Sequence, residues 1–245
     1  MGKFFFNAGE IVGGHVAITG QAAHHMLNVL RFRVGERILL CDGASQDYPA
    51  ILHDISDKPV ALTFHLGAPK ASHGEPPFHI TLYQGIAKGD KMDWIIEKCI
   101  EVGACKIVPV ITARTVVKVK DASKKAERYA RIAESAAGQC MRGAIPKISA
   151  PLSLAEALRG HTATHSLIAY EGESVNTIKS ALQNTMPGPI SIWVGPEGGF
   201  EEQEVNTIKN TLNATPVSLG PRILRTETSG IVAISTILCA WEGHT

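Results

Sequence analysis

The 245-residue sequence contains few cysteines and no arrangement of them that is typical of a metal or redox site. It has no C-x-x-C pair, and because the count is odd, at least one thiol has no disulfide partner within the chain. The ten histidines form no cluster with acidic residues at metal-ligand spacing. These absences argue against a zinc site and a disulfide framework. They predict reduced thiols at Cys41, Cys99, Cys105, Cys140 and Cys239 in a cytoplasmic protein that needs no metal.

Long hydrophobic runs are also absent. No apolar stretch approaches the ~18 residues that a membrane-spanning helix requires. The apolar patch at Phe4–Phe6 is too short for a signal peptide, and position 6 lacks the Ser or Thr that myristoylation at Gly2 would require. With 44% apolar and 19% charged residues, the composition is that of a folded globular protein. We therefore expect no membrane association.

The chain has little net charge, +1, but the charge is unevenly distributed. Residues 88–147 hold thirteen Lys and Arg against seven Asp and Glu, whereas residues 148–245 hold five against nine. A basic segment in a near-neutral protein is typical of a surface that binds a polyanion. It is equally typical of solvated helix faces, and charge alone does not separate the two.

The first 70 residues have the pattern of a compact β-barrel. Several short β-rich segments are bounded by turn residues, and one segment has helical periodicity. The polar, proline-rich stretch 71–77 then predicts a linker between two domains. The expected strands are Lys3–Asn7, His15–Thr19, Glu36–Asp42, Tyr48–Ser56 and Val60–Gly67, and the expected helix is Gln21–Leu30.

Residues 78–245 have a different pattern, in which strands alternate with helices. This alternation predicts an α/β domain with a parallel sheet covered by helices. The expected strands are Phe78–Ile86, Lys106–Thr112, Lys147–Ala150, His165–Tyr170, Pro189–Val194 and Pro216–Leu219. The expected helices are Asp90–Val102, Ala122–Cys140, one opened by Ser153, Val175–Leu182, Glu201–Leu212 and Thr226–Trp241.

One candidate ligand-binding loop is Gly195-Pro196-Glu197-Gly198-Gly199, directly after an apolar strand. Ligands of open α/β sheets bind beyond the carboxyl ends of strands, and glycines let a ligand approach the backbone closely. The loop matches neither G-x-x-x-x-G-K-[ST] nor G-x-G-x-x-G, which argues against nucleoside triphosphates and against a dinucleotide-dependent oxidoreductase. The acidic helix start behind it also disfavours phosphate, so we expect a ligand that lacks phosphate.

A second loop, Leu219 to Thr228, also follows a strand and opens a helix. Helix capping explains Thr226, Glu227 and Thr228, but arginines are unfavourable near the positive end of a helix dipole. Arg222 and Arg225 therefore indicate an anionic or polar ligand, the alternative being surface arginines at a plain helix start. A third loop, Glu171-Gly172-Glu173 after Tyr170, is by itself a weak signal.

The combined motifs resemble those of the RsmE family, the ribosomal small-subunit RNA (uridine-N3) methyltransferases of the SPOUT class. The resemblance extends along nearly the whole chain, with small departures such as Ser229, where the family usually has Ala. The matching residues include His25, Leu30-Arg31, Lys88-Gly89-Asp90-Lys91-Met92-Asp93, Glu127-Arg128, Gln139, Arg142, Gly195–Phe200 and Ile223–Thr228.

The resemblance implies a PUA-like β-barrel for RNA at residues 1–70 and a SPOUT domain with a deep trefoil knot at residues 78–245. It implies S-adenosylmethionine as cofactor, 16S rRNA as substrate, either free or within the assembled small subunit, and a homodimer. By the resemblance, the cofactor is held by Tyr170, Glu171, Val194, Gly195, Pro196, Gly198, Gly199, Leu219, Gly220, Ile223, Leu224, Arg225 and Thr228.

For the reaction we expect Arg225 and Arg114 to stabilise the uridine anion, because a nearby cation favours developing negative charge. Glu197 or Glu227 is expected to accept the proton. The expected RNA contacts are Arg31, Arg33, Lys88, Lys91, Arg114, Arg128, Gln139 and Arg142, with ion pairing on exposed helices as the alternative. Two other functions stay open, namely a SPOUT methyltransferase with another RNA target and a non-catalytic RNA-binding assembly factor.

Overall fold

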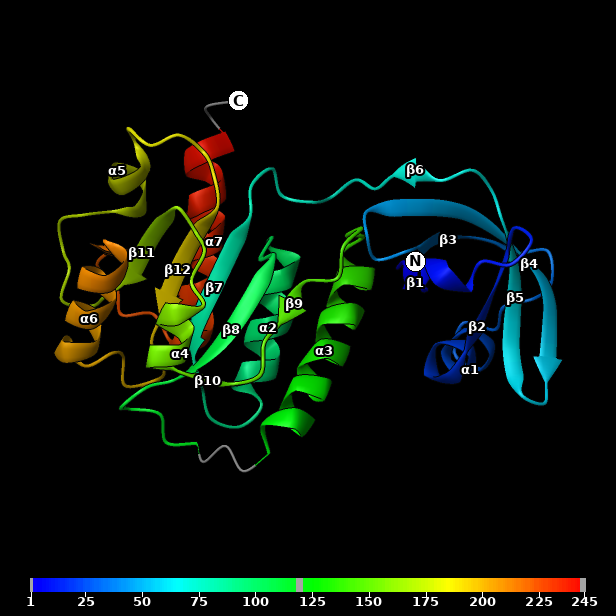
Figure 1. The fold of residues 1–245 in the computed structure, drawn as a ribbon, viewed down its shortest axis with the longest axis horizontal. Coiled ribbons are helices and arrows are strands. Elements are labelled where there is room, and N and C mark those ends of the chain that lie inside the picture. The colour runs from blue at the N-terminus through cyan, green and yellow to red at the C-terminus, as the bar shows by residue number, and fades with distance from the viewer. Residues whose placement is uncertain (1, 118–120, 243–245) are drawn as a thin grey trace. The chain divides into compact units, whose positions relative to one another are not determined.

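The computed structural model describes residues 2–117 and 121–242 (Figure 1). The chain divides into two compact units. The first unit comprises Met1–Glu75 and Ala137–Ile145, and the second comprises Pro76–Ala136 and Pro146–Thr245.

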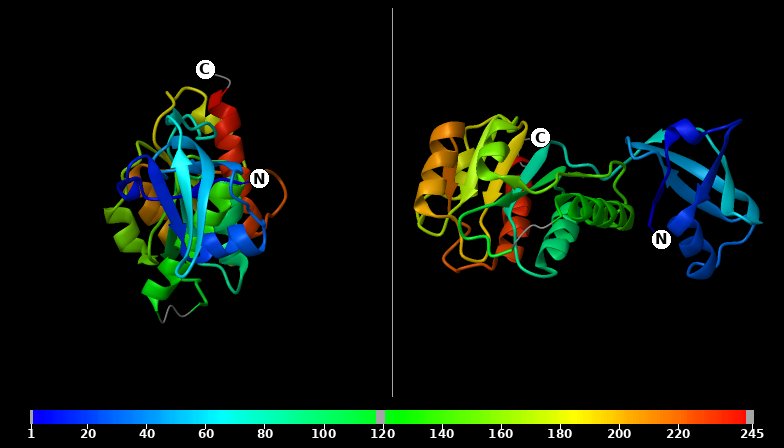
Figure 2. Two further views of the ribbon diagram at one scale, coloured as in Figure 1. Left: turned by 90° about the vertical axis from the view of Figure 1, so that its right-hand side faces the viewer. Right: turned by 60° about the horizontal axis from the view of Figure 1, so that its bottom comes forward.

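The first unit is built on a curved sheet around an apolar core (Figure 2). The strand order is β1-β3-β4-β5-β2, with β6 beside β4, and each pairing is antiparallel except that of β1 with β3. Alternating residues face the core, as in Val16 and Ile18 of β2. The bounds are β1 Phe4–Phe5, β2 His15–Thr19, β3 Arg37–Cys41, β4 Gln46–Asp57, β5 Val60–Leu66, β6 Lys70–Ala71, a 3-10 turn Ala8–Glu10 and α1 Gly20–Asn28.

Residues 137–145 belong to the first unit although they are distant from it in sequence. The carbonyl of Gly138 accepts a hydrogen bond from the N–H of Lys3, and the carbonyl of Gly143 accepts one from the N–H of Ser45. The sequence predicts a linker at 71–77, and the boundary between the units, after Glu75, lies within it, although Ala71 still belongs to strand β6. No periodicity marks such an insertion, because only long-range pairing creates it.

Arg142, in the inserted segment, is 3% exposed. Its Nη2 donates to Oε2 of Glu75 at 2.7 Å, and Oε1 of Glu75 also accepts from the N–H groups of Gly143 and Ala144. Burial alone would raise the pKa of Glu75. Arg142 and these N–H groups nevertheless hold that pKa below its usual value. The expectation that Arg142 contacts RNA therefore does not fit the structure, because its guanidinium is buried in an ion pair.

The second unit contains a parallel sheet with helices on both faces (Figure 1), as the sequence predicts. The strand order is β10-β8-β7-β12-β11-β13, with β9 beside β8, and every pairing is parallel. The bounds are β7 Ile80–Gly85, β8 Lys106–Ile111, β9 Lys147–Ile148, β10 Leu152–Ser153, β11 His165–Ala169, β12 Ile190–Val194 and β13 Thr215–Val217.

Helices α4 and α6 cover one face of this sheet, while α2, α5 and α7 pack together on the other. The bounds are α2 Lys91–Glu101, α3 Ala122–Gln139, α4 Leu154–Arg159, α5 Ile178–Leu182, α6 Glu202–Leu212 and α7 Thr226–Glu242. Because the strands are parallel, their carboxyl ends lie at one edge of the sheet, and the loops that follow β11, β12 and β13 meet there.

A polar cluster lies in the second unit beside the stacked rings of Tyr83 and Trp193, whose centroids are 4.0 Å apart. Nε2 of His161 lies 2.9 Å from Oγ of Ser191 and 3.0 Å from Oγ of Ser166. Burial, and to a lesser extent the charge of Lys106, lowers the pKa of His161 from its ordinary 6.5. Burial therefore favours the neutral form of His161 in the folded protein.

We predict that Arg142→Met lowers the free energy of unfolding by about 3 kcal/mol, because it leaves the Glu75 carboxylate partly buried without its cation. The matched change Arg128→Met, at an exposed arginine paired with Asp93, should cost much less, because exposed ion pairs contribute little to stability. Urea unfolding of both variants measures the difference, and equal stabilities would contradict the assignment.

We also predict that His161 makes stability depend on pH. Because its pKa is lower in the folded than in the unfolded state, the unfolded chain takes up the proton first as the pH falls below about 6.5. The free energy of unfolding should then decline with falling pH, and His161→Phe should remove that part of the decline. Urea titrations between pH 7.5 and 5 measure it, with His24→Gln as an exposed control. Parallel curves for wild type and His161→Phe would refute the prediction.

Candidate active site

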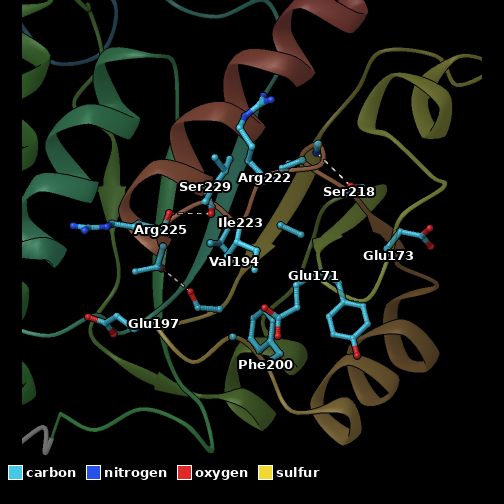
Figure 3. Close-up of a pocket in the computed structure, with 18 of the residues that line it drawn as sticks. Glu171, Glu173, Val194, Glu197, Phe200, Ser218, Arg222, Ile223, Arg225 and Ser229 are labelled. Atoms are coloured by element: carbon cyan, nitrogen blue, oxygen red, sulfur yellow. Dashed lines mark hydrogen bonds between the residues drawn. The ribbon is translucent and has the colours of Figure 1, made fainter.

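A pocket of about 730 Å³ opens at the carboxyl edge of the parallel sheet (Figure 3). Its walls come from the three loops after β11, β12 and β13 and from the starts of α2 and α7. The lining residues are Lys91, Ala169–Glu171, Glu173, Ser174, Thr177, Val194–Glu197, Gly199, Phe200, Ser218–Glu227 and Ser229.

Glycines give the loop after β12 its close packing. A Cβ on Gly195 would lie 2.7 Å from the carbonyl carbon of Gly199, and a Cβ on Gly85 would lie 2.5 Å from the nitrogen of Pro196. Both approaches involve backbone atoms that cannot yield to a side chain. Gly199 also has φ +69°, a left-handed conformation that favours glycine. The loop thus presents backbone groups to the pocket.

The carbonyl of Gly195 is the centre of a buried hydrogen-bond network. Thr226 Oγ1 donates to it at 2.6 Å, and Gln84 Nε2 donates to it at 3.3 Å and to Thr226 Oγ1 at 2.9 Å. Gln84 is 0% exposed. This network joins β7, the loop after β12 and the start of α7. Sequence reasoning missed Gln84, although a lone amide in an apolar strand was an available signal.

The loop after β13 is fixed by the carbonyl of Arg225. That carbonyl accepts hydrogen bonds from the N–H groups of Thr228 and Ser229 and from Oγ of Ser229 at 3.0 Å. The hydroxyl of Ser229 therefore steadies the turn that positions Arg225. Ile223, in the same loop, is 90% exposed although it lines the pocket.

Carboxylates line two sides of the pocket. Glu173 accepts hydrogen bonds from the N–H groups of Asn176 and Val175, which lower its pKa and fold the loop after β11. Figure 3 shows Glu173 on one side and Glu197 and Arg225 on the opposite side, with Glu171 between them beside Phe200. Lys91 Nζ lies between Glu197 and Glu227, 3.3 Å and 3.5 Å from their carboxylate oxygens.

The structure brings most of the predicted cofactor residues together in this pocket. Gly198 and Thr228 are the exceptions, since neither is among the lining residues. Ser218, Arg222 and Phe200 line the pocket but were absent from the predicted set, although they adjoin residues in it. The residues of that set that line the pocket are Tyr170, Glu171, Val194, Gly195, Pro196, Gly199, Leu219, Gly220, Ile223, Leu224 and Arg225.

The predicted catalytic residues fall into two groups. Arg225, Glu197 and Glu227 line the pocket, whereas Arg114 lies one layer outside it. The Arg114 Nη1 donates to the carbonyl of Gly198 at 2.6 Å, and its Nε lies 3.9 Å from Glu201. Arg114 thus holds the glycine loop from behind.

The predicted RNA contacts are dispersed. Lys88 is exposed beside the pocket, and its N–H donates to Glu197, while Lys91 faces the pocket itself. Arg128 is exposed and paired with Asp93. In the first unit, Arg31, Arg33 and Gln139 are exposed.

Among the described residues, no group of three or more His, Cys, Asp or Glu is arranged to hold a metal ion. In the same part of the chain, no helix is long and apolar enough to cross a membrane.

Comparison with known proteins identifies the family. The model of an RNA methyltransferase domain matches residues 74–238, and that of an RNA methyltransferase PUA domain matches residues 18–64. Ribosomal RNA small subunit methyltransferase E of Bacillus subtilis is 36% identical over 230 residues, covering 90% of this chain and 88% of that protein. The chain belongs to the RsmE family of RNA methyltransferases.

Two solved methyltransferase structures share the whole fold. The ribosomal RNA small subunit methyltransferase E from Neisseria gonorrhoeae, solved bound to S-adenosyl methionine, has a TM-score of 0.87 and 32% identity, covering 98% of both chains. A putative methyltransferase from Legionella pneumophila, solved with the bound cofactor SAM, has a TM-score of 0.87 and 28% identity over 98% of this chain and 97% of that one.

We predict that Thr226→Val loosens the glycine loop. The variant removes the hydroxyl that donates at 2.6 Å to the buried Gly195 carbonyl and leaves it the longer bond from Gln84, a loss of about 0.5–1.5 kcal/mol. Hydrogen–deuterium exchange of residues 195–200 should therefore become severalfold faster. Thr207→Val, at an exposed threonine of α6, is the matched control. Unchanged exchange in Thr226→Val would show that the network does not hold the loop.

Proposed function

We propose that this chain is an S-adenosylmethionine-dependent methyltransferase that modifies N3 of a uridine in 16S rRNA of the small ribosomal subunit. The observation that carries the proposal is the three-loop pocket at the carboxyl edge of the sheet in a member of the RsmE family. A relative with the same fold, from Neisseria gonorrhoeae, was solved with S-adenosyl methionine bound.

The pocket fits this cofactor. Its volume of about 730 Å³ is within the usual range for small-ligand sites. Its charged lining residues are four carboxylates, Glu171, Glu173, Glu197 and Glu227, and three cations, Lys91, Arg222 and Arg225. A slightly acidic lining suits a sulfonium cation that carries no phosphate. The glycine loop offers main-chain groups for an adenosine moiety.

The chemistry of the base defines what the protein must supply. N3–H of uracil is weakly acidic and lies on the pairing edge, so the base must be unpaired or flipped out. When bound, the cofactor supplies an electrophilic methyl group. The protein must then orient N3 towards that methyl group, take up the N3 proton and stabilise negative charge on the uracil oxygens.

We assign these tasks to the side of the pocket where Arg225 and Glu197 extend (Figure 3). Arg225 is exposed there and stabilises the uridine anion. Arg114 acts from outside, by holding the carbonyl of Gly198 and so the loop. Glu197 and Glu227 are the two carboxylates on this side that can take the proton.

We further propose that the exposed residues Arg31, Arg33, Lys88, Arg128 and Gln139 contact the RNA, and that the protein acts as a cytoplasmic homodimer. Partly exposed apolar residues on α7, Ile231, Val232 and Leu238, support a subunit contact there. The trefoil knot belongs to the same proposal, which membership of the RsmE family supports.

The test is to identify the modified nucleoside formed on small-subunit RNA, free and assembled, with labelled S-adenosylmethionine. We expect N3-methyluridine. Arg225→Ala should lower the single-turnover rate about 100–1,000-fold, as expected for the loss of a group that stabilises developing charge. Cofactor affinity should change much less. Arg159→Ala, on α4, is the control.

Three results would contradict the proposal. Another modified nucleoside would point to a different RNA target, and RNA binding without methyl transfer would point to an assembly factor. Equal losses of rate and cofactor affinity in Arg225→Ala would make Arg225 a pocket-shaping residue.

A further inference from the structure

Three charged side chains from separate segments meet on the side of the pocket that we assign to the base. Lys91 is the first residue of α2, Glu197 belongs to the loop after β12, and Glu227 lies in the first turn of α7. The Lys91 Nζ is 3.3 Å from Glu197 Oε1 and 3.5 Å from Glu227 Oε2. The lysine thus lies between two carboxylates at the pocket wall.

The two carboxylates differ in their hydrogen-bond partners. Glu197 Oε1 accepts a hydrogen bond from the N–H of Lys88 at 3.0 Å. Burial alone would raise the pKa of Glu197, but this hydrogen bond and Lys91 lower it. Glu227 Oε2 is buried and has no hydrogen-bond partner among the described residues. Because hydrogen bonds to a carboxylate weaken it as a base, Glu227 is the better proton acceptor of the two.

Helix stability does not explain why a lysine occupies position 91. A cation at the first position of a helix is disfavoured by the helix dipole, and Asp90 makes no side-chain cap there. The two carboxylates compensate this cost. Lys98, further along the same helix, shows the ordinary alternative, since it pairs with Glu97 and Glu101 away from the pocket.

We infer that the Glu227 carboxylate accepts the N3 proton of the target uridine and that Lys91 is the cation that offsets the charge left on the base. The inference rests on the proposed function and deepens it. As the N3–H bond breaks, the proton binds Glu227, the N3 electron pair forms the bond to the methyl carbon, and the carbon–sulfur pair stays on sulfur.

Lys91 has a defined task in this step. While Glu227 is ionised, the ammonium offsets its charge. Once Glu227 is neutral, the ammonium is left to offset the charge on the uracil oxygens, and Glu197 keeps it in place. The other charged side chains around the pocket are Arg225 and Arg222 in the loop before α7 and Glu171 and Glu173 in the loop after β11.

The experiment compares Glu227→Gln, Glu227→Asp, Lys91→Met and the matched control Lys98→Met. Single-turnover rates are measured from pH 6 to 9 on RNA with uridine or 5-fluorouridine at the target position. The fluorine makes N3–H more acidic, so the modified base depends less on an acceptor. Calorimetry of S-adenosylmethionine binding without RNA supplies an independent measure of folding and pocket integrity.

For Glu227→Gln we expect a rate on uridine RNA at least about 100-fold lower at pH 7, a typical contribution of a general base. The rate should rise with pH where the wild type is level, and 5-fluorouridine should restore most of it. Lys91→Met should show a smaller loss with the same rescue, and Glu227→Asp should recover part of the rate. Cofactor affinity should stay within about threefold, and Lys98→Met should match the wild type on both RNAs.

The inference fails if Glu227→Gln keeps the wild-type rate, or if its loss is equal on uridine and 5-fluorouridine RNA with an unchanged pH profile. The proposed function fails separately, if the wild type itself forms no N3-methyluridine on any small-subunit RNA.

Discussion

The carbonyl of Gly195 is the group on which the rest of the site depends. It is buried and needs donors, and Thr226 and Gln84 supply them from α7 and β7. Glycines at positions 85 and 195 make this approach possible, because a Cβ at either would collide with backbone. Packing of three distant segments on one carbonyl fixes where β12 ends. The same packing sets where the neighbouring loops begin.

The charges around the pocket follow from that geometry. The loop after β12 brings Glu197 to one side, and the start of α7 brings Arg225 and Glu227 to the same side. Lys91 lies at the positive end of its own helix dipole, and two carboxylates pair with it there. The loop after β11 adds Glu171 and Glu173, whose carboxylates suit a sulfonium. One pocket thereby offers different surroundings to a cationic donor and to a base that becomes anionic.

Much of this arrangement was predictable from the sequence. The strand–helix alternation after residue 78 predicted the parallel sheet, and the glycine loop at 195–199 and the arginines at 222 and 225 marked its functional edge. Pairings between distant residues were not predictable. Gln84 and Lys91 have roles that depend on segments more than a hundred residues away, and Arg142 resembles a surface arginine until Glu75 is placed beside it. Periodicity reports local structure, and these partners are set by the fold.

The most direct test of the account is a crystal structure of this protein with S-adenosylmethionine bound. We predict that the adenosine lies against the main chain of Gly195–Gly199 and the loop before α7, with the methyl group directed towards Arg225 and Glu227. A cofactor bound elsewhere, or one whose methyl group points towards Glu171 and Glu173, would contradict it.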